Sequence, residues 1–280
     1  MHRKQDLERP SSLNVASVTM SCHQDPDANL RKMVDITGSI MGERPETQLI
    51  VFGEMILGWY DPEELPDYHR RISIHLSHDS LGDLSRMASE FGVYICAGFS
   101  ENDGGYLYNS QVLFDRLGDP RVHRKHNLKQ SEVSCGYHPG TDPFTVTGVM
   151  GLKTAMVICS DLARFSTMRK LAGIRPDLVI LSLADDSDPG FLMARVNARM
   201  YDSWIVTANR FGAEDDRLWE GHTVISDPRG RLRKTSIGRE TVLYQKLDFP
   251  PSDPVSRFFR KLITRAPLPF IILSNWKRLR

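Results

Sequence analysis

Three residues that could together hydrolyse an amide lie where stretches of regular structure are expected to end. Glu54 and Cys159 each follow a short apolar run, and Lys125 lies in the basic stretch 122–126. A thiol can attack a carbonyl carbon, a carboxylate can carry the proton, and an ammonium can stabilise the oxyanion that forms. The residue types therefore predict nucleophilic cleavage of a C–N bond, provided that the fold brings the three side chains together.

Each of these residues alone has a simpler explanation. A glutamate after a strand is most often a solvated turn residue, a buried cysteine is usually inert, and a lysine in a basic stretch usually faces solvent. Cys159 stands at an expected strand-to-helix turn, where its sulfur would be exposed near the positive end of a helix. That position favours a thiolate and therefore chemistry.

The elements that would position these residues alternate between strand and helix. The run 13–20 has the length and β-branched content of a buried strand, and Asp25-Pro-Asp27 then supplies the start of a helix. The same alternation predicts strands at 49–52, 93–97, 110–114, 154–158, 178–183 and 204–208, and helices at 81–91, 167–172 and 191–201. Late in the chain, the strands 224–226 and 241–247 flank Asp227-Pro-Arg-Gly230, which has hairpin-turn chemistry. The pattern predicts an α/β fold with helices covering buried sheets.

Composition indicates one globular domain with a distinct tail. The 280 residues are 40% hydrophobic and 25% charged, and no linker-like stretch divides residues 1–250. Residues 251–280 hold seven Lys or Arg and one acidic residue, although the whole chain carries only +1. The N-terminus lacks the apolar core of a secretory signal, and no stretch approaches the ~20 apolar residues of a membrane span, so we expect a soluble, cytoplasmic protein. The four cysteines are sparse and lack metal-type spacing, which predicts reduced thiols.

The segments around the three candidate residues resemble the nitrilase superfamily of carbon-nitrogen hydrolases. Leu49-Ile-Val-Phe-Gly-Glu54 with Gly58-Trp-Tyr60, His123-Arg-Lys-His-Asn-Leu128, and Ile158-Cys-Ser-Asp161 with Arg164-Phe165 are similar to the segments that carry the family's Glu, Lys and Cys. Flanking segments extend the resemblance over residues 13–248 in the family's order: 97–101, 108–110, 138–140, 207–210 and 226–230.

This resemblance implies a four-layer α-β-β-α sandwich and an amidase that needs no cofactor and no metal. Cys159 would attack the amide to form a thioester, Glu54 would carry the proton, and Lys125 with the backbone N–H of Ser160 would stabilise the oxyanion. Glu132, the one carboxylate between Lys125 and residue 139, would take the place of a supporting glutamate. The resemblance also implies a homodimer or higher homo-oligomer, with helices near Cys159 and at 191–201 packing against a partner.

Departures from the family pattern limit what the resemblance implies about substrate and assembly. The family's Pro before the first Glu is Gly53, the Pro-Glu after Arg-Phe is Ser166-Thr167, and Arg-Ala-x-Glu-Asn reads Asn197-Ala-Arg-Met-Tyr201. The nucleophile segment Cys-Ser-Asp is nearer to amidases than to true nitrilases. We therefore expect a small linear amide or an N-carbamoyl compound as substrate, and not a nitrile.

Acidic and aromatic residues are expected near the mouth of the pocket. Tyr60 and Asp185 are the candidates for substrate contact, together with Trp59, Asp186 and Asp188. An acidic mouth would suit an amide that carries an amine, although acidic loops are more often only solvated.

Two other features invite a function and are set aside. The histidine pairs His75/His78 and His123/His126 have no Cys or Glu partners at metal-type spacing, so a zinc site is not expected. The tail interleaves Phe258, Phe259, Leu262 and Ile263 with basic residues and could lie on an anionic membrane surface, but an arm packed across a partner subunit is favoured. No nucleic-acid partner is expected.

Two interpretations of other classes stay open beside the hydrolase. The chain could be a catalytically silent binding or scaffold protein, or an N-acyltransferase that passes the thioester to an amine. Intact Glu54, Lys125 and Cys159 argue against a silent protein.

Overall fold

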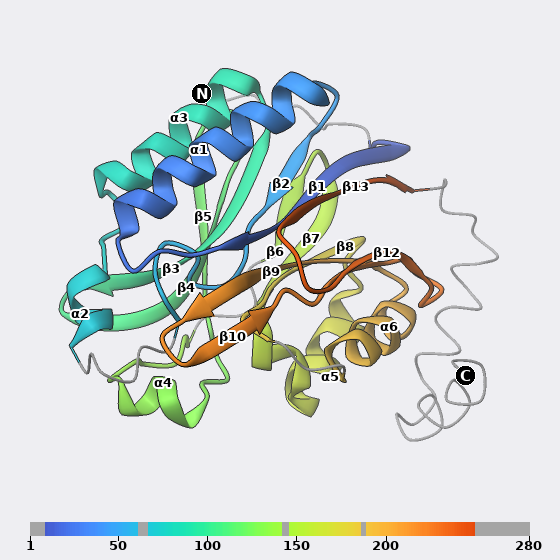
Figure 1. Cartoon of the computed structure of the whole chain (residues 1–280). Coiled ribbons are helices and arrows are strands. Elements are labelled where there is room, and N and C mark those ends of the chain that lie inside the picture. Colours follow the sequence, from blue (N-terminus) through green and yellow to red (C-terminus); the bar gives the residue numbers. More distant parts are fainter. Residues whose placement is uncertain (1–8, 61–66, 142–145, 186–188, 250–280) are drawn as a thin grey trace, which may run out of the picture.

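Two twisted β-sheets lie face to face between two pairs of helices (Figure 1). The computed structural model describes residues 9–60, 67–141, 146–185 and 189–249. The basic tail, residues 251–280, therefore lies outside the described residues, and its separation from a 1–250 domain stays a prediction. No helix in the described ranges is both long and apolar enough to cross a bilayer.

The first sheet contains the strands that precede Glu54 and Lys125. Its order is β5-β4-β3-β2-β1, with β13 on the other side of β1. The pairs β1–β2 and β2–β3 are parallel, and the other neighbours are antiparallel. Its strands are β1 (Ser12–Ser21), β2 (Leu49–Val51), β3 (Tyr94–Asp103), β4 (Tyr106–Phe114), β5 (Pro120–Arg124) and β13 (Thr241–Asp248).

The second sheet contains the strand that precedes Cys159. Strands β7, β8 and β9 run parallel, and β6 and β11 flank them antiparallel. The long strand β9 belongs to both sheets, because its first half pairs with β8 and its second half with β1. Its strands are β6 (Val146–Val149), β7 (Leu152–Ile158), β8 (Leu178–Ser182), β9 (Trp204–Glu214), β11 (Thr223–Ser226) and β12 (Leu232–Ser236), and β10 (Arg217–Glu220) extends β9.

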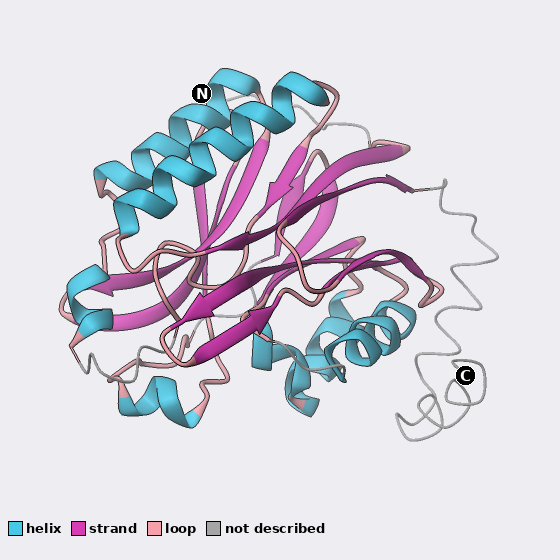
Figure 2. Cartoon of the chain, viewed as in Figure 1, coloured by secondary structure: helices cyan, strands magenta, loops and turns pink. Residues whose placement is uncertain are grey.

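Helices cover the outer face of each sheet (Figure 2). The long helices α1 (Pro26–Glu43) and α3 (Asp79–Phe91) lie on the first sheet, and α5 (Phe165–Ile174) and α6 (Pro189–Tyr201) lie on the second. Shorter turns are α2 (Tyr68–Ile72), α4 (Gln130–Ser134) and the 3-10 helix η1 (Cys159–Ala163).

Alternating side chains explain why the sheets are buried on both faces. Leu13 and Val15 of β1 pack between the sheets, whereas Ala16, Val18 and Met20 pack under α1 and α3. Successive side chains of a strand point to opposite faces, so an almost wholly apolar strand fills two cores. A third core lies between the second sheet and α5 and α6. Three cores separate four layers, which confirms the predicted α-β-β-α sandwich.

The hairpin expected late in the chain has a different second strand. The turn after Ser226 returns through β12, which pairs with β11. Strand β13 instead pairs with β1 over eight residues, from Ser12–Asp248 to Thr19–Thr241. The expectation that 241–247 completes this hairpin is therefore wrong. The correct partner of β11 is β12, which was not predicted because its sequence is charged and mostly exposed.

Candidate active site

Glu54 lies where the two sheets meet. It follows β2, and its backbone N–H donates to the carbonyl of Leu183, just beyond β8, at 3.1 Å. The neighbouring β3 residue Gly98 has no room for a side chain, since an added Cβ would lie 2.4 Å from the Met55 nitrogen and 2.8 Å from the Glu54 Cα. Glu54 is thus fixed by backbone contacts from both sheets and is 1% exposed.

Lys125 joins Glu54 and Glu132 in one buried network. Its ammonium Nζ donates to Glu54 Oε1 at 2.6 Å and to Glu132 Oε1 at 2.8 Å. The side-chain amide of Asn109 donates to the same two oxygens, at 2.7 and 2.5 Å. The remaining oxygens accept from backbone, Glu54 Oε2 from Ala184 N at 2.9 Å and Glu132 Oε2 from Lys129 N at 2.7 Å. Each carboxylate therefore has three donors in a site with almost no contact with water.

The network keeps Lys125 charged. Burial acts to lower the pKa of Lys125, but the negative charges of Glu54, of a Cys159 thiolate and of Glu132 outweigh it, so the pKa is raised. Because two carboxylates surround one ammonium, deprotonating Lys125 would leave two buried negative charges without compensation.

Cys159 comes directly after β7, close enough to Glu54 for the charge of that carboxylate to act on the pKa of its thiol. Its Sγ lies 4.0 Å from the carbonyl oxygen of Ala184, the residue whose N–H donates to Glu54. Its φ of 40° places it in the left-handed region, which costs a non-glycine residue energy and is typical of active-site turns. The structure therefore places Glu54, Lys125, Glu132 and Cys159 in one buried neighbourhood, and their catalytic roles stay a prediction.

The expected exposed thiolate is wrong. Cys159 is only 9% exposed, and it is the first residue of a short 3-10 helix, where the sequence had indicated the start of a longer helix. Burial and the negative charge of Glu54 raise the pKa of the Cys159 thiol to about 12, despite the opposing charges of Lys125 and Lys129. At neutral pH the resting group is a thiol, so a base must take its proton when it reacts.

Buried Asp161 ties the turn that carries Cys159 to the turn that carries Lys125. Its Oδ1 accepts from the backbone N–H groups of His126 and Asn127 at 3.0 and 2.7 Å, and its Oδ2 lies 3.3 Å from His123 Nε2. Ser160 adds to this link, because its hydroxyl donates to the Asn127 carbonyl at 2.5 Å. Two turns that are far apart in sequence are thus held in fixed register.

A second buried ion pair holds the segment after Glu54. The Arg210 guanidinium donates to the carbonyls of Glu54 at 2.9 Å and Gly58 at 2.5 Å, and it pairs with Glu214. Glu214 also accepts from the backbone N–H of Tyr60 at 2.8 Å. Arg210 is 0% exposed, so this pair acts as an internal clamp on residues 54–60.

Tyr60 forms part of an aromatic wall beside the network. Its ring meets Trp219 edge-to-face at 5.7 Å between centroids, and Lys125 Nζ lies 5.9 Å from its centroid. Half-buried Asp185 lies close enough for its charge to raise the pKa of Cys159. Asp186 and Asp188 lie outside the described residues, so the acidic mouth stays a prediction.

The histidines that invited a metal interpretation have other neighbours. His123 contacts Asp161, and the His75 ring lies 2.8 Å from the Ser77 hydroxyl. In the described part of the chain, no three His, Cys, Asp or Glu side chains are arranged to hold a metal ion.

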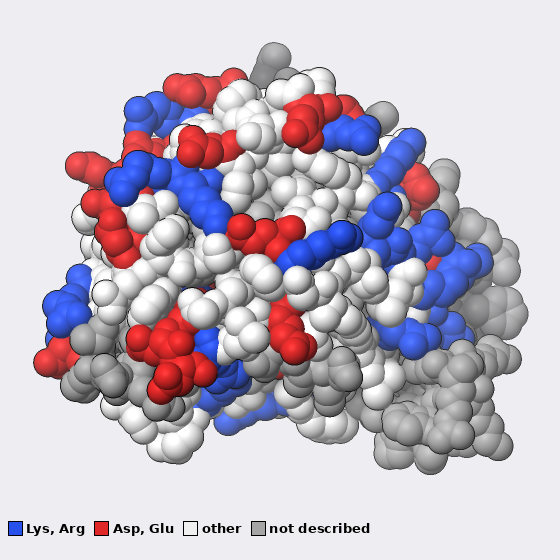
Figure 3. Space-filling model, in the orientation of Figure 1, with Lys and Arg blue, Asp and Glu red and all other residues white. Residues whose placement is uncertain are grey.

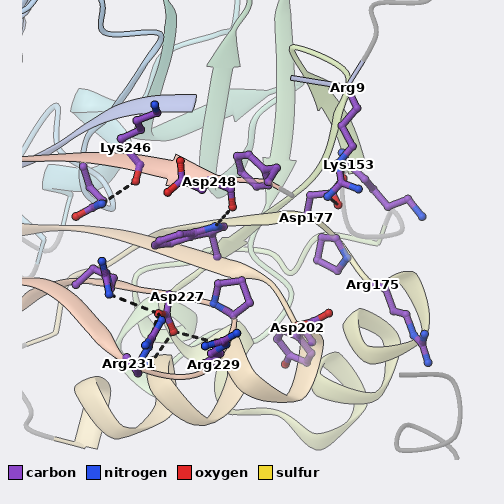
Figure 4. A pocket seen from close by; sticks show the side chains of 17 residues that line it. Arg9, Lys153, Arg175, Asp177, Asp202, Asp227, Arg229, Arg231, Lys246 and Asp248 are labelled. Atoms are coloured by element: carbon purple, nitrogen blue, oxygen red, sulfur yellow. Dashed lines mark hydrogen bonds and ion pairs between the residues drawn. The ribbon is translucent and has the colours of Figure 1, made fainter. Parts of the chain in front are cut away.

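A large pocket lies at the opposite end of the second sheet (Figure 4). Its volume is about 680 Å³, and Lys153, Asp177 and Trp204 in its wall lie within one residue of the starts of β7, β8 and β9. Cys159 follows the carboxyl end of β7, so this pocket is not the candidate site. Its ion pairs Arg9–Asp177 and Arg231–Asp227 belong to a charged end of the molecule, where basic side chains gather in Figure 3.

Asn109, Arg210 and Glu214 were not predicted as site residues. The available signal was polarity inside strands: β4 buries the consecutive polar residues Asn109, Ser110 and Gln111, and β9 buries a complete arginine. Buried polar groups need partners, so such residues mark a network even when the partner cannot be identified from sequence.

Comparison with known proteins agrees with this geometry. The family model described as Carbon-nitrogen hydrolase matches residues 14–254. An (R)-stereoselective amidase from Pseudomonas sp is 30% identical over 215 residues, which are 74% of this chain and 74% of that protein.

Solved structures share the fold. Nit3 of Saccharomyces cerevisiae, a member of branch 10 of the nitrilase superfamily, has a TM-score of 0.79 at 22% identity and covers 96% of this chain and 99% of its own. A mutant amidase from Nesterenkonia sp. AN1, which shows the result of Michael addition of acrylamide at the active site cysteine, has a TM-score of 0.74 at 18% identity over 89% of this chain and 99% of its own. The chain thus belongs to the carbon-nitrogen hydrolase family of the nitrilase superfamily.

Proposed function

We propose that this protein is an amidase that cleaves a small linear amide or N-carbamoyl compound through a Cys159 thioester. The observation that carries the proposal is the contact chain at the junction of the sheets. Lys125 donates to Glu54, Ala184 N donates to the other Glu54 oxygen, and the Ala184 carbonyl lies beside the Cys159 sulfur. A nucleophile, a proton carrier and a fixed positive charge thus share one buried site.

Glu54 acts as base and then as acid. Because the resting Cys159 is a thiol, its proton moves to Glu54 as the sulfur bonds to the carbonyl carbon. Glu54 then protonates the leaving nitrogen as the C–N bond breaks, which releases ammonia or an amine and leaves an S-acyl enzyme. Water attacks the thioester, Glu54 takes a proton from that water, and the thiol re-forms as the acid product leaves.

Lys125 stabilises the negative charge that develops during both steps. Its ammonium is pre-oriented by Glu54 and Glu132, so it needs no reorganisation when the oxyanion forms. The backbone N–H of Ser160 is the second donor in this proposal, and Glu132 acts as the positioning residue for Lys125. Tyr60 and Asp185 complete the pocket.

Amide hydrolysis measured as ammonia release tests the proposal. Cys159→Ala should lower the rate by about a thousandfold or more, and Glu54→Gln by about a hundredfold to ten-thousandfold. Cys135→Ser changes a different cysteine, which is of intermediate burial and has no role in the proposed reaction. This variant is the control and should keep the wild-type rate.

The two alternatives give different outcomes in the same assay. A silent scaffold releases no ammonia from any amide and forms no acyl adduct. An acyltransferase forms the adduct but turns over only when an amine acceptor is added.

A further inference from the structure

Lys129 presents an ammonium beside the candidate site that lacks an ion-pair partner among the described residues. Lys125, four residues earlier, pairs with both Glu54 and Glu132. No carboxylate of residues 9–60, 67–141, 146–185 or 189–249 forms a salt bridge or hydrogen bond with the Lys129 ammonium. Its neighbour in this range is the Tyr60 ring, whose centroid lies 5.6 Å from Nζ.

The backbone of Lys129 is fixed to the catalytic network. Its N–H donates to Glu132 Oε2 at 2.7 Å, and the other Glu132 oxygen accepts from Lys125. Lys129 is also the N-cap residue of α4, so the side chain leaves from a defined point. Tyr60 is near both ammonium groups, with Lys125 Nζ at 5.9 Å from its centroid. The Lys129 side chain therefore lies beside Tyr60, the same ring that lies near Lys125.

The charge of Lys129 acts inside the site. It lowers the pKa of the Cys159 thiol, and its influence on that group is larger than the opposite influence of Asp185. Lys129 is half-buried, so its charge is less screened than that of a fully exposed lysine.

A half-buried ammonium that no described carboxylate contacts is an attractive position for an anion. Lys125 is not available for this role, because two of its three N–H bonds point to carboxylates and the third is the proposed donor to the oxyanion. A carboxylate that reached Lys129 would gain a charge-assisted hydrogen bond in a partly desolvated place.

We propose that Lys129 binds an anionic group on the acyl portion of the substrate, so that the preferred substrates are linear amides with a carboxylate at the far end. This inference rests on the proposed amidase function and adds the charge of the substrate. A contact of this kind should favour the anionic amide about ten- to a hundredfold in kcat/KM.

Three amides of equal length test the proposal, because they differ only in the terminal group. Pentanamide ends in a methyl group, glutaramate in a carboxylate, and 4-aminobutanamide in an ammonium. We expect the wild-type enzyme to prefer glutaramate. Lys129→Met keeps the length of the side chain and should remove that preference mainly through a higher KM for glutaramate, so that the variant hydrolyses glutaramate and pentanamide with kcat/KM values within about threefold of each other. Lys129→Glu should favour 4-aminobutanamide.

Lys234→Met, at an exposed lysine of β12, is the matched control and should keep the wild-type selectivity. The proposal is overturned if the wild type prefers the neutral or cationic amide, or if Lys129→Met lowers kcat/KM equally for all three. The latter result would mean that Lys129 acts on the Cys159 nucleophile and does not bind the terminal group of the substrate. Failure of the amidase function itself looks different, since no amide would then be hydrolysed by the wild type.

Discussion

Lys125 is the residue on which the charge balance of the site depends. The two buried carboxylates, Glu54 and Glu132, both accept hydrogen bonds from its ammonium. Asn109 also donates to them, but its amide is neutral and does not offset their negative charge. Lys125 should therefore contribute to the stability of the fold as well as to the reaction, because its removal leaves uncompensated negative charges in the interior.

We therefore predict that Lys125→Met lowers the free energy of unfolding by about 3–5 kcal/mol at neutral pH. Urea denaturation measures this change, and Lys234→Met, which removes an exposed lysine, should stay within about 0.5 kcal/mol of wild type. A loss below about 1 kcal/mol for Lys125→Met would show that the two carboxylates do not depend on its charge.

The protonation state of Cys159 gives a prediction for its reactivity with pH. Burial raises the thiol pKa to about 12, so the thiolate fraction should rise about tenfold per pH unit between pH 7 and 10. The Glu54→Gln variant removes the carboxylate that could take the thiol proton and, with it, a charge that raises the thiol pKa, whereas burial, the larger cause, remains. In that variant, alkylation of Cys159 by iodoacetamide, followed by peptide mass spectrometry, should still rise with pH above pH 8. A plateau at or below about pH 8 would contradict the buried thiol.

At the scale of the elements, β3 constrains the position of Glu54, because its backbone at Gly98 packs directly against the backbone of residues 53–55. A Cβ on Gly98 would meet Gly53 O at 2.7 Å and Met55 N at 2.4 Å, both backbone atoms. Since backbone on both sides resists movement, Gly98→Ala should displace Glu54.

We expect Gly98→Ala to cost about 1–3 kcal/mol of stability and to lower kcat at least about tenfold in the protein that stays folded. Gly148→Ala in β6 is the matched control, because an added Cβ there has no atom within 4 Å. Equal kcat values for the two variants, measured on the same folded fraction, would show that Glu54 is not held by this contact.

The sequence predicted the elements that carry Glu54 and Cys159 better than the one that carries Lys125. Strands β2 and β7 are apolar and buried, so their ends could be located from hydrophobicity alone. Strand β5, Pro120-Arg-Val-His-Arg124, lies at the edge of the sheet and contains charged residues and a proline. Edge strands tolerate such residues, so this strand could not be recognised from its hydrophobicity.

The burial of Cys159 could not be predicted, because the groups around it come from remote parts of the chain. Ala184 and the residues around Tyr60 close the site, and these contacts depend on how the two sheets meet at β9. The same reason explains why Asn109 and Arg210 were missed, since each acts through partners that are remote in sequence.

At the scale of the whole molecule, the outer face of α5 and α6 is the surface that we propose joins a second copy of the chain. Phe165 at the start of α5 is 60% exposed, and Met168, Phe191 and Val196 keep part of their surface exposed, although Met168 and Phe191 also pack against the core beneath the helices. Apolar side chains on the outside of a domain mark a contact surface.

Phe165→Asp should therefore shift the mass in solution from dimer toward monomer, as measured by light scattering at micromolar concentration. Leu117→Asp, at a 79% exposed leucine in the loop before β5, is the matched control and should leave the mass unchanged. A wild-type protein that is monomeric at high concentration would contradict the dimer.

The central claim is that Cys159 becomes covalently acylated by the substrate, and the mass of the intact protein measures it directly. Wild type mixed with an amide substrate and quenched in acid should gain the mass of the acyl group, and digestion should place that mass on the peptide that contains Cys159. Cys159→Ala should gain none and should release no ammonia. Acylation of a different residue, or ammonia release by Cys159→Ala at the wild-type rate, would contradict the account.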